Sequence, residues 1–293
     1  MNTAGKLSAY GVALVLVAAG AWAIGTAVGP ISSSTAAPGM EEAGHGDTHS
    51  GTVAETLDEP VGLASSRGGY TFTPTSTTLP AGTPTTFSFH ITGPDGHAVT
   101  RFDVEHEKRM HLIVVRRDTA GFQHIHPAMA ADGTWSVPVT LGAPGSYRAF
   151  ADFTPSGGEG TTLGVDLAAP GDFQPRTYEP TTLSTVDGYE VRLDGDLVAG
   201  KTSEVTLTVS KDGRPVTDLQ PYLGAYGHLV ALRGGDLAYL HVHPDGEPGD
   251  GKTAAGPSVT FFAEVPSAGA YRLFLDFKHG DVVRTAEFTV VGS

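Results

Sequence analysis

The chain has no cysteine among its 293 residues. Disulfide bonds, thiolate metal sites, cysteine nucleophiles and a lipid-modified cysteine are therefore excluded. Positive charge is also scarce, because 18 Lys and Arg residues stand against 32 Asp and Glu residues, giving a formal net charge of −14. This balance argues against nucleic acid or an anionic membrane surface as a partner, and it makes cations the electrostatically favoured ligands.

Helix-like patterns are scarce in most of the chain, whereas turn residues are abundant. The sequence has 39 Gly, 20 Pro and 40% hydrophobic residues. Such a composition is typical of β-rich modules with many turns, and 293 residues leave room for two of them. We therefore predict an all-β protein in which short strands form two β-sandwich domains.

The exception to this composition lies at the N-terminus, where residues 9–31 (AYGVALVLVAAGAWAIGTAVGPI) form an uncharged and mostly apolar run. The run is long enough to cross a bilayer as a helix. Lys6 precedes it, and Glu41 and Glu42 follow before any further Lys or Arg, so the N-terminus is expected to stay cytoplasmic. We predict a single-pass membrane anchor over residues 1–31, uncleaved rather than removed as a signal peptide, with the folded domains extracytoplasmic.

The rest of the chain divides into a linker and two repeats. Residues 32–68 are rich in small and polar residues and predict a flexible linker. Residues 69–172 and 173–293 each contain seven or eight strand-like segments in the same order, which indicates a tandem duplication. A Pro-rich stretch, AAPGDFQPRTYEP, marks the boundary between them.

Both repeats contain the pattern Gly-x-Tyr-Arg-x-Phe-x-Asp-Phe, at residues 145–153 and 269–277. It resembles the tyrosine corner of immunoglobulin-like sandwiches, in which the hydroxyl bonds back to nearby backbone. We therefore interpret Tyr147 and Tyr271 as structural. Asp152 and Asp276 have two interpretations, as local hydrogen-bond acceptors or as carboxylates that orient a metal-binding imidazole.

The most informative repeat is a histidine pattern. Residues 110–127, MHLIVVRRDTAGFQHIHP, return as residues 227–244, GHLVALRGGDLAYLHVHP. Both copies keep three histidines at identical spacing, so half of the twelve histidines fall into two matched triads. The triads are His111, His124 and His126 in the first repeat, and His228, His241 and His243 in the second.

Each copy reads as a β-hairpin, because two short apolar runs flank a polar turn. If Gly235 and Asp236 occupy the turn, His228 stands opposite His243, and the same register in the first copy places His111 opposite His126. Residues that face each other in this way have Cβ atoms about 4.5–5.5 Å apart on one face of the sheet. The predicted register therefore gathers three imidazoles at the open end of each hairpin.

Three converging imidazoles suit Zn, Cu, Ni or Fe. We predict metal ligation by all six triad histidines, and in the first repeat also by Met110, whose thioether would favour Cu(I) over Zn(II). The competing interpretation is that the histidines are half-buried polar residues or turn devices, and that Met110 is a core methionine. Metal binding is expected to weaken as the pH falls toward the imidazole pKa of about 6.5.

Enzyme interpretations fit the pattern less well. His-x-His with a distant histidine occurs in zinc hydratases and cupin oxygenases, but no Glu-containing cupin motif follows it here and no general base is evident. Copper/zinc superoxide dismutase is disfavoured by the single three-histidine set in each repeat and by the missing disulfide. G-x-S-x-G, P-loop and H-E-x-x-H motifs are absent from the sequence. We predict that the protein is not an enzyme.

The strings KRMHLIVVRRDTAGFQHIHP and DGTWSVPVTLGAPGSYRAFADF resemble a family of membrane-anchored or secreted bacterial proteins common in actinobacteria. That family has an HLIVVRRD…FQHxHP core and is associated with heavy-metal handling, especially of copper. The resemblance covers the first repeat well and the second more loosely, through GHLVALR and LHVHP. It implies metal homeostasis outside the membrane, through the six triad histidines.

The sequence therefore predicts a membrane-tethered, extracytoplasmic protein that buffers or transfers copper or zinc, with one three-histidine site in each repeat. The alternative is an interaction module that binds another cell-envelope protein and uses its histidines structurally. Metal titration distinguishes the two, because the alternative predicts no stoichiometric binding.

Overall fold

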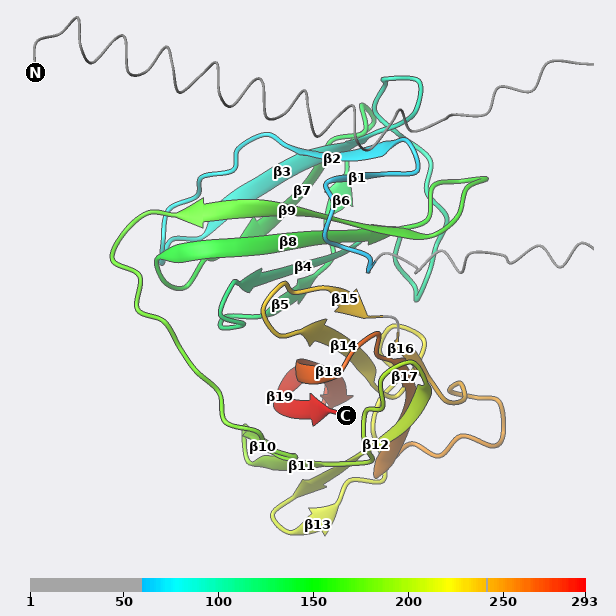
Figure 1. Cartoon of the computed structure of the whole chain (residues 1–293). Coiled ribbons are helices and arrows are strands. Elements are labelled where there is room, and N and C mark those ends of the chain that lie inside the picture. The colour runs from blue at the N-terminus through cyan, green and yellow to red at the C-terminus, as the bar shows by residue number, and fades with distance from the viewer. Residues whose placement is uncertain (1–59, 241) are drawn as a thin grey trace, which may run out of the picture. The chain divides into compact units, whose positions relative to one another are not determined.

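The computed structural model describes residues 60–240 and 242–293 (Figure 1). Within these residues every assigned element is a β-strand, which confirms the predicted all-β class. The predicted membrane anchor and most of the predicted linker lie outside the described residues. In the part that is described, no helix has the length and apolar character needed to cross a membrane.

The first repeat contains two antiparallel sheets. They enclose a core whose largest side chains are aromatic and come from both sheets, for example Phe87 and Trp135 from one sheet and Tyr147 from the other. One sheet has five strands, in the order β1 (Ser66–Arg67), β2 (Tyr70–Pro74), β3 (Thr85–Thr92), β7 (Trp135–Val139) and β6 (Ala128–Met129). The other has four, in the order β5 (Gln123–Ile125), β4 (His111–Arg116), β8 (Gly145–Phe153) and β9 (Thr161–Ala169).

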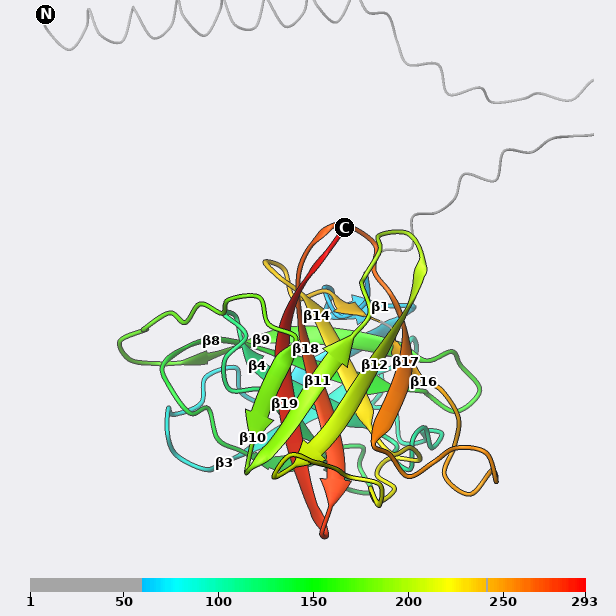
Figure 2. The same ribbon diagram turned by 90° about the horizontal axis from the view of Figure 1, so that it is seen from below.

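The second repeat follows the same plan around a core of its own. Its larger sheet runs β10 (Leu183–Val186), β11 (Tyr189–Asp194), β12 (Thr202–Lys211), β17 (Ser258–Glu264) and β16 (Val242–Pro244), with β13 (Arg214–Pro215) paired to β12. Figure 2 shows β10, β11, β12 and β17 side by side in this order. Its smaller sheet runs β15 (Tyr239–Leu240), β14 (His228–Arg233), β18 (Gly269–His279) and β19 (Val282–Gly292).

Buried and more exposed residues alternate along β3 but not along β4. In β3 every second residue is buried, as expected for a strand with one face on a core. All six residues of β4 are buried, because its two faces meet different cores. Leu112 and Val114 belong to the core of the first repeat, whereas Ile113 and Val115 belong to a separate apolar cluster.

This separate cluster joins the two repeats, because it also contains residues of β14 and β18. The two four-stranded sheets therefore pack against each other through their outer faces. Full burial of one large apolar side chain is worth roughly 1.5–3 kcal/mol. We call this cluster the junction; its buried members are Ile113, Val115, Phe150, Val230, Leu232, Leu237 and Phe274.

Both tyrosine corners form as predicted. The Tyr147 hydroxyl donates to the backbone oxygen of Ala143 at 2.7 Å, and the Tyr271 hydroxyl donates to the backbone oxygen of Ser267. Tyr147 and Tyr271 are almost fully buried, so these bonds satisfy hydroxyl groups that water does not reach. The structural interpretation of both tyrosines is confirmed.

The predicted hairpin register is also confirmed where the strands pair. Ile113 lies opposite His124 on β4 and β5, and Ala231 lies opposite Leu240 on β14 and β15. The hairpins differ in how long this pairing lasts. In the second repeat the chain leaves the hairpin after Leu240, and Val242–Pro244 pairs instead with β17 in the other sheet.

Candidate metal centre at the junction of the repeats

His111 and His124 are placed by the first hairpin. Side chains alternate along a strand, so His111 points to the same face as Ile113 and Val115, which is the junction face. His124 is directly opposite Ile113 and therefore shares that face. Both imidazoles lie near the N-terminal end of β4, at one end of the junction.

His228 is placed in the same way by the second repeat. It begins β14 and shares a face with Val230 and Leu232, which are junction residues. Its ring lies 4.9 Å from the ring of His124 and stacks on the ring of His111 at 5.8 Å with an interplanar angle of 5°. One ligand nitrogen from each of His111, His124 and His228 lies within 4.8 Å of the other two.

A chain of hydrogen bonds fixes the tautomers of two of these rings. Nδ1 of His124 lies 2.8 Å from Oδ2 of Asp276, and Nε2 of His111 lies 3.1 Å from the backbone oxygen of Glu105. A carboxylate and a carbonyl oxygen only accept hydrogen bonds, so both of these ring nitrogens are protonated. The remaining nitrogens, Nε2 of His124 and Nδ1 of His111, face each other at 3.1 Å.

In neutral rings these two facing nitrogens both carry lone pairs. Burial lowers the pKa of His111 to about 4, so the His111 ring is not expected to hold a second proton at neutral pH. A cation resolves this conflict, because it accepts both lone pairs at once. Two nitrogens bound to one tetrahedral zinc at about 2.0–2.1 Å lie roughly 3.3–3.4 Å apart, close to the observed spacing.

His126 adds a further donor beside this pair. Its ring lies 5.0 Å from that of His111 and 4.9 Å from that of His124. Its Nε2 is buried and has no hydrogen-bond partner, and burial lowers the pKa of His126 to about 3. A buried neutral nitrogen without a partner is costly unless something fills the gap, which a metal ion does.

Asp276 comes from the opposite repeat to the histidine that it orients. It is buried and also accepts a hydrogen bond from the Thr285 hydroxyl at 2.6 Å. A carboxylate that holds Nδ1–H of a histidine fixes the ring and makes its other nitrogen a better ligand. Asp276 thus bonds locally to Thr285 and also orients an imidazole, so it combines features of both interpretations that the sequence left open.

Met110 packs into the core of the first repeat together with Leu112 and Val114. It is 1% exposed and also lines a pocket of about 370 Å³ beside His126 and Met129. His111 points to the junction, so the side chains of Met110 and His111 lie on opposite faces of the chain at the start of β4. The structure thus gives Met110 the role of a core methionine at the wall of this pocket.

The second triad is not brought together in the way the sequence suggested. His243 is exposed on β16 opposite Phe262, whose neighbours Phe261 and Ala263 point into the core. His243 therefore lies on the outer face of its sheet, while His228 turns to the junction. His241 lies outside the described residues. Among the described residues, His111, His124, His126 and His228 form one cluster to which both repeats contribute.

The proximity of histidines from both repeats was not predicted from the sequence. One signal was available, because the uninterrupted apolar run at residues 112–115 is typical of a strand that is buried on both faces. A second face implies a second packing layer, which here is the other repeat. Nothing in the local sequence of Asp276 indicates that it reaches His124.

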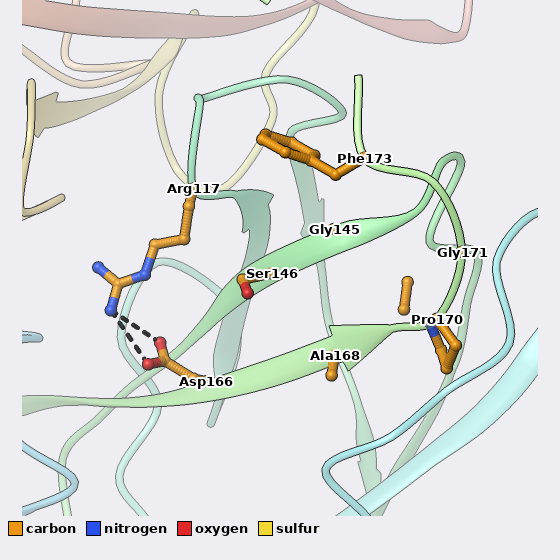
Figure 3. A pocket seen from close by; sticks show the side chains of 9 residues that line it. Arg117, Gly145, Ser146, Asp166, Ala168, Pro170, Gly171 and Phe173 are labelled. Carbon is orange, nitrogen blue, oxygen red and sulfur yellow. Dashed lines mark hydrogen bonds and ion pairs between the residues drawn. The ribbon is translucent and has the colours of Figure 1, made fainter. Parts of the chain in front are cut away.

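A larger pocket, of about 510 Å³, lies near the opposite end of β4 and is drawn in Figure 3. Arg117 forms an ion pair with Asp166 at 3.0 Å along its side. The remaining lining consists of glycine, alanine, proline, serine and phenylalanine, without any histidine. This lining offers no set of converging donors for a metal ion.

Solved structures with some similarity to the chain include bacterial adhesins. They include the Escherichia coli adhesin FdeC (15% identity, TM-score 0.26, 78% of this chain and 65% of that one) and the Yersinia pseudotuberculosis adhesin InvE (11%, 0.23, 76% and 58%). Invasin, a bacterial integrin-binding protein, matches at 15% identity and a TM-score of 0.23, over 75% of this chain and 39% of that one. The chain thus spans less than two thirds of these structures, and such low TM-scores carry no argument about its own role.

No curated protein matches the chain. A family model does match, and it does so twice, over residues 64–170 and 184–292. The two matches fall on the two repeats and together cover more than half of the sequence. The chain therefore belongs to the family described as a domain of unknown function, DUF8832.

Proposed function

We propose that the protein binds one copper or zinc ion reversibly, at a single centre built by both repeats. The observation that carries this proposal is the pair of ring nitrogens, Nδ1 of His111 and Nε2 of His124, that face each other at 3.1 Å. Their other nitrogens are committed to Glu105 and Asp276, so rotating the rings would break those bonds. A shared cation is the simplest chemical complement to this arrangement.

The donor set supports copper or zinc rather than a hard cation. Imidazole nitrogens suit Zn(II) and Cu, whereas Mg²⁺ and Ca²⁺ prefer oxygen ligands. His228 forms a group of three with the facing pair, each offering a nitrogen within 4.8 Å of the others, and the ring of His126 lies beside them. The carboxylate of Asp276 offsets part of the charge of a bound ion, and the formal net charge of −14 favours its approach.

The proposed setting is the outer side of a membrane, to which residues 9–31 would tether the chain. The apolar run and the charges that flank it support this placement. The resemblance of the first repeat to bacterial copper-handling proteins points the same way. In this setting the centre would buffer the ion or pass it to another envelope component.

Metal titration of the full-length chain, purified without a histidine tag, tests the proposal. We expect one Zn(II) or copper ion per chain, and loss of binding in the double variant His111→Ala plus His124→Ala. His97→Ala, which removes an exposed histidine elsewhere in the first repeat, is the control and should bind normally. Absence of stoichiometric binding would contradict the proposal.

The second candidate is an interaction module of the cell envelope. In that case the histidines would only tie the repeats together, and the exposed sheet faces would bind a partner protein. The cross-repeat bond from His124 to Asp276 is compatible with this role as well. The same titration decides between the two, because a structural histidine cluster binds no ion in stoichiometric amount.

A further inference from the structure

Two turns occupy equivalent places beside the histidine cluster. In the first repeat, Glu105 and Lys108 exchange backbone hydrogen bonds of 2.8 and 2.9 Å, and in the second repeat Tyr222 and Ala225 do so at 2.8 and 3.2 Å. The two central residues of each turn have positive φ, with values of 46° and 65° in the first and 56° and 78° in the second. Both are therefore tight turns of the same type.

The turns differ in the side chain at their first central position. Leu223 is buried, with 1% of its surface exposed. His106, at the same place in the first repeat, is exposed. Positive φ disfavours most residues with a Cβ, but histidine, like Asn and Asp, is found there more often than other residues, so the turn accommodates His106.

His106 touches the cluster as well as the solvent. Its ring lies 5.7 Å from that of His228 and 6.2 Å from that of His111, edge-on in both cases, with interplanar angles of 71° and 75°. The rings of His111 and His228 stack on each other, and His106 lies along one side of this stack, at a similar distance from both rings. The His106 ring therefore contacts the buried rings of His111 and His228 on one side and solvent on the other.

We infer that His106 is the exchange ligand of the centre, the imidazole through which a soft or borderline cation such as Zn(II) or Cu enters and leaves. This inference rests on the proposed function. An ion arriving from water binds His106 first and is then taken over by His228 and His111, while its remaining waters are shed. Release follows the reverse order, because His106 offers a new bond before the last inner bond breaks.

A ligand that acts only during exchange affects rates and not end states. It lowers the barrier between bound and free ion, so its removal slows binding and release by the same factor and leaves the dissociation constant unchanged. A permanent ligand behaves differently, because its loss weakens equilibrium binding. Kinetics and affinity measured on the same variant therefore separate the two roles.

The test uses full-length protein loaded with one equivalent of Zn(II), mixed with an excess of a chromophoric chelator. The variant His106→Asn removes the imidazole and keeps a residue that tolerates positive φ. We expect its zinc release to be at least about tenfold slower than that of the wild type, the least effect typical of losing a supporting metal-site residue. Its stoichiometry and dissociation constant should stay at the wild-type values.

The control is His97→Asn, which replaces another exposed histidine of the first repeat and should release zinc at the wild-type rate. Unchanged release from His106→Asn with intact stoichiometry would overturn the inference and leave the proposed function standing. A dissociation constant raised tenfold or more would also overturn it, because His106 would then be a permanent ligand. Failure of the wild type itself to bind zinc would overturn the proposed function and this inference together.

Discussion

The two repeats contact each other through equivalent pairs of aromatic side chains. Phe122 of the first repeat stacks on Phe274 of the second, with ring centroids 4.0 Å apart. At the equivalent place, Tyr239 of the second repeat contacts Phe150 of the first at 5.8 Å. Each hairpin thus covers the sheet of the other repeat, as in the isologous interface of a two-fold dimer.

The hairpins diverge at the histidines. In the first repeat β5, which contains His124, pairs with β4 through Ile125, and His126 follows near the junction. In the second repeat the pairing of β15 with β14 ends at Leu240. His243 then pairs within the other sheet and faces outward. Identical histidine spacing therefore does not produce identical sites, because a strand that changes sheets carries its side chains to another face.

The largest expected effect comes from breaking the junction. Phe274→Ala removes a fully buried ring and its stack on Phe122, and we expect a loss of about 3–5 kcal/mol in the free energy of unfolding. Urea unfolding followed by tryptophan fluorescence measures it. Phe150→Ala is the matched variant of the other repeat and should cost somewhat less, because its contact with Tyr239 is tilted and longer. A loss below about 1 kcal/mol for Phe274→Ala would show that the repeats do not depend on the junction.

The next comparison is between two histidines of the second repeat. Loss of a residue that only supports a ligand weakens metal binding by up to about 100-fold. His228→Ala removes a donor of the shared cluster itself, so it should weaken metal binding by more than about 100-fold. His243→Ala, on the outer face of its sheet, should leave affinity unchanged. Isothermal titration of both variants with Zn(II) measures the difference. Equal losses in the two variants would restore a separate site in the second repeat.

Much of the fold was predictable because it depends on local patterns. Alternating apolar residues, the polar turn at Gly235 and Asp236 and the two tyrosine corners specify strands, register and corners without long-range information. The grouping of His111 with His124 follows from that register alone. These features survive in both repeats because each depends on neighbours a few residues away.

The parts that could not be predicted depend on distant contacts. His124 and Asp276 are 152 positions apart, and their bond exists only because the two sheets pack face to face. β16 leaves the hairpin because it pairs with β17, and no local pattern around His243 predicts this pairing. The sequence therefore predicted the grouping of His111 with His124, and it did not predict that His228 lies beside them.

The buried histidines also predict how stability of the metal-free protein depends on pH. Burial lowers the pKa of His111 to about 4 and that of His126 to about 3, whereas both are near 6.5 in the unfolded chain. Between these values the unfolded state binds more protons, so stability is lost as the pH falls from 6.5 toward 4. The slope is at most about 1.4 kcal/mol per pH unit for each histidine. Thermal melts across this range measure it, and a flat profile would contradict the burial of neutral rings.

The smallest expected effect concerns the hydroxyls behind the two equivalent aspartates. Thr285 donates to Asp276 at 2.6 Å, and Thr162 donates to Asp152 at 2.9 Å. Thr285→Val should weaken metal binding by about three- to tenfold, because Asp276 then holds His124 less firmly. Thr162→Val makes the same chemical change in the other repeat.

Titration of both valine variants with Zn(II) shows which aspartate supports the centre. If only Asp276 does so, Thr162→Val binds like the wild type, and the functional asymmetry of the repeats extends from the ligands to the residues behind them. If both variants weaken binding equally, the Asp152 side takes part in the same centre. The ion would then be held by contacts that respect the two-fold relation of the rings, and the difference between the hairpins would matter for His243 alone.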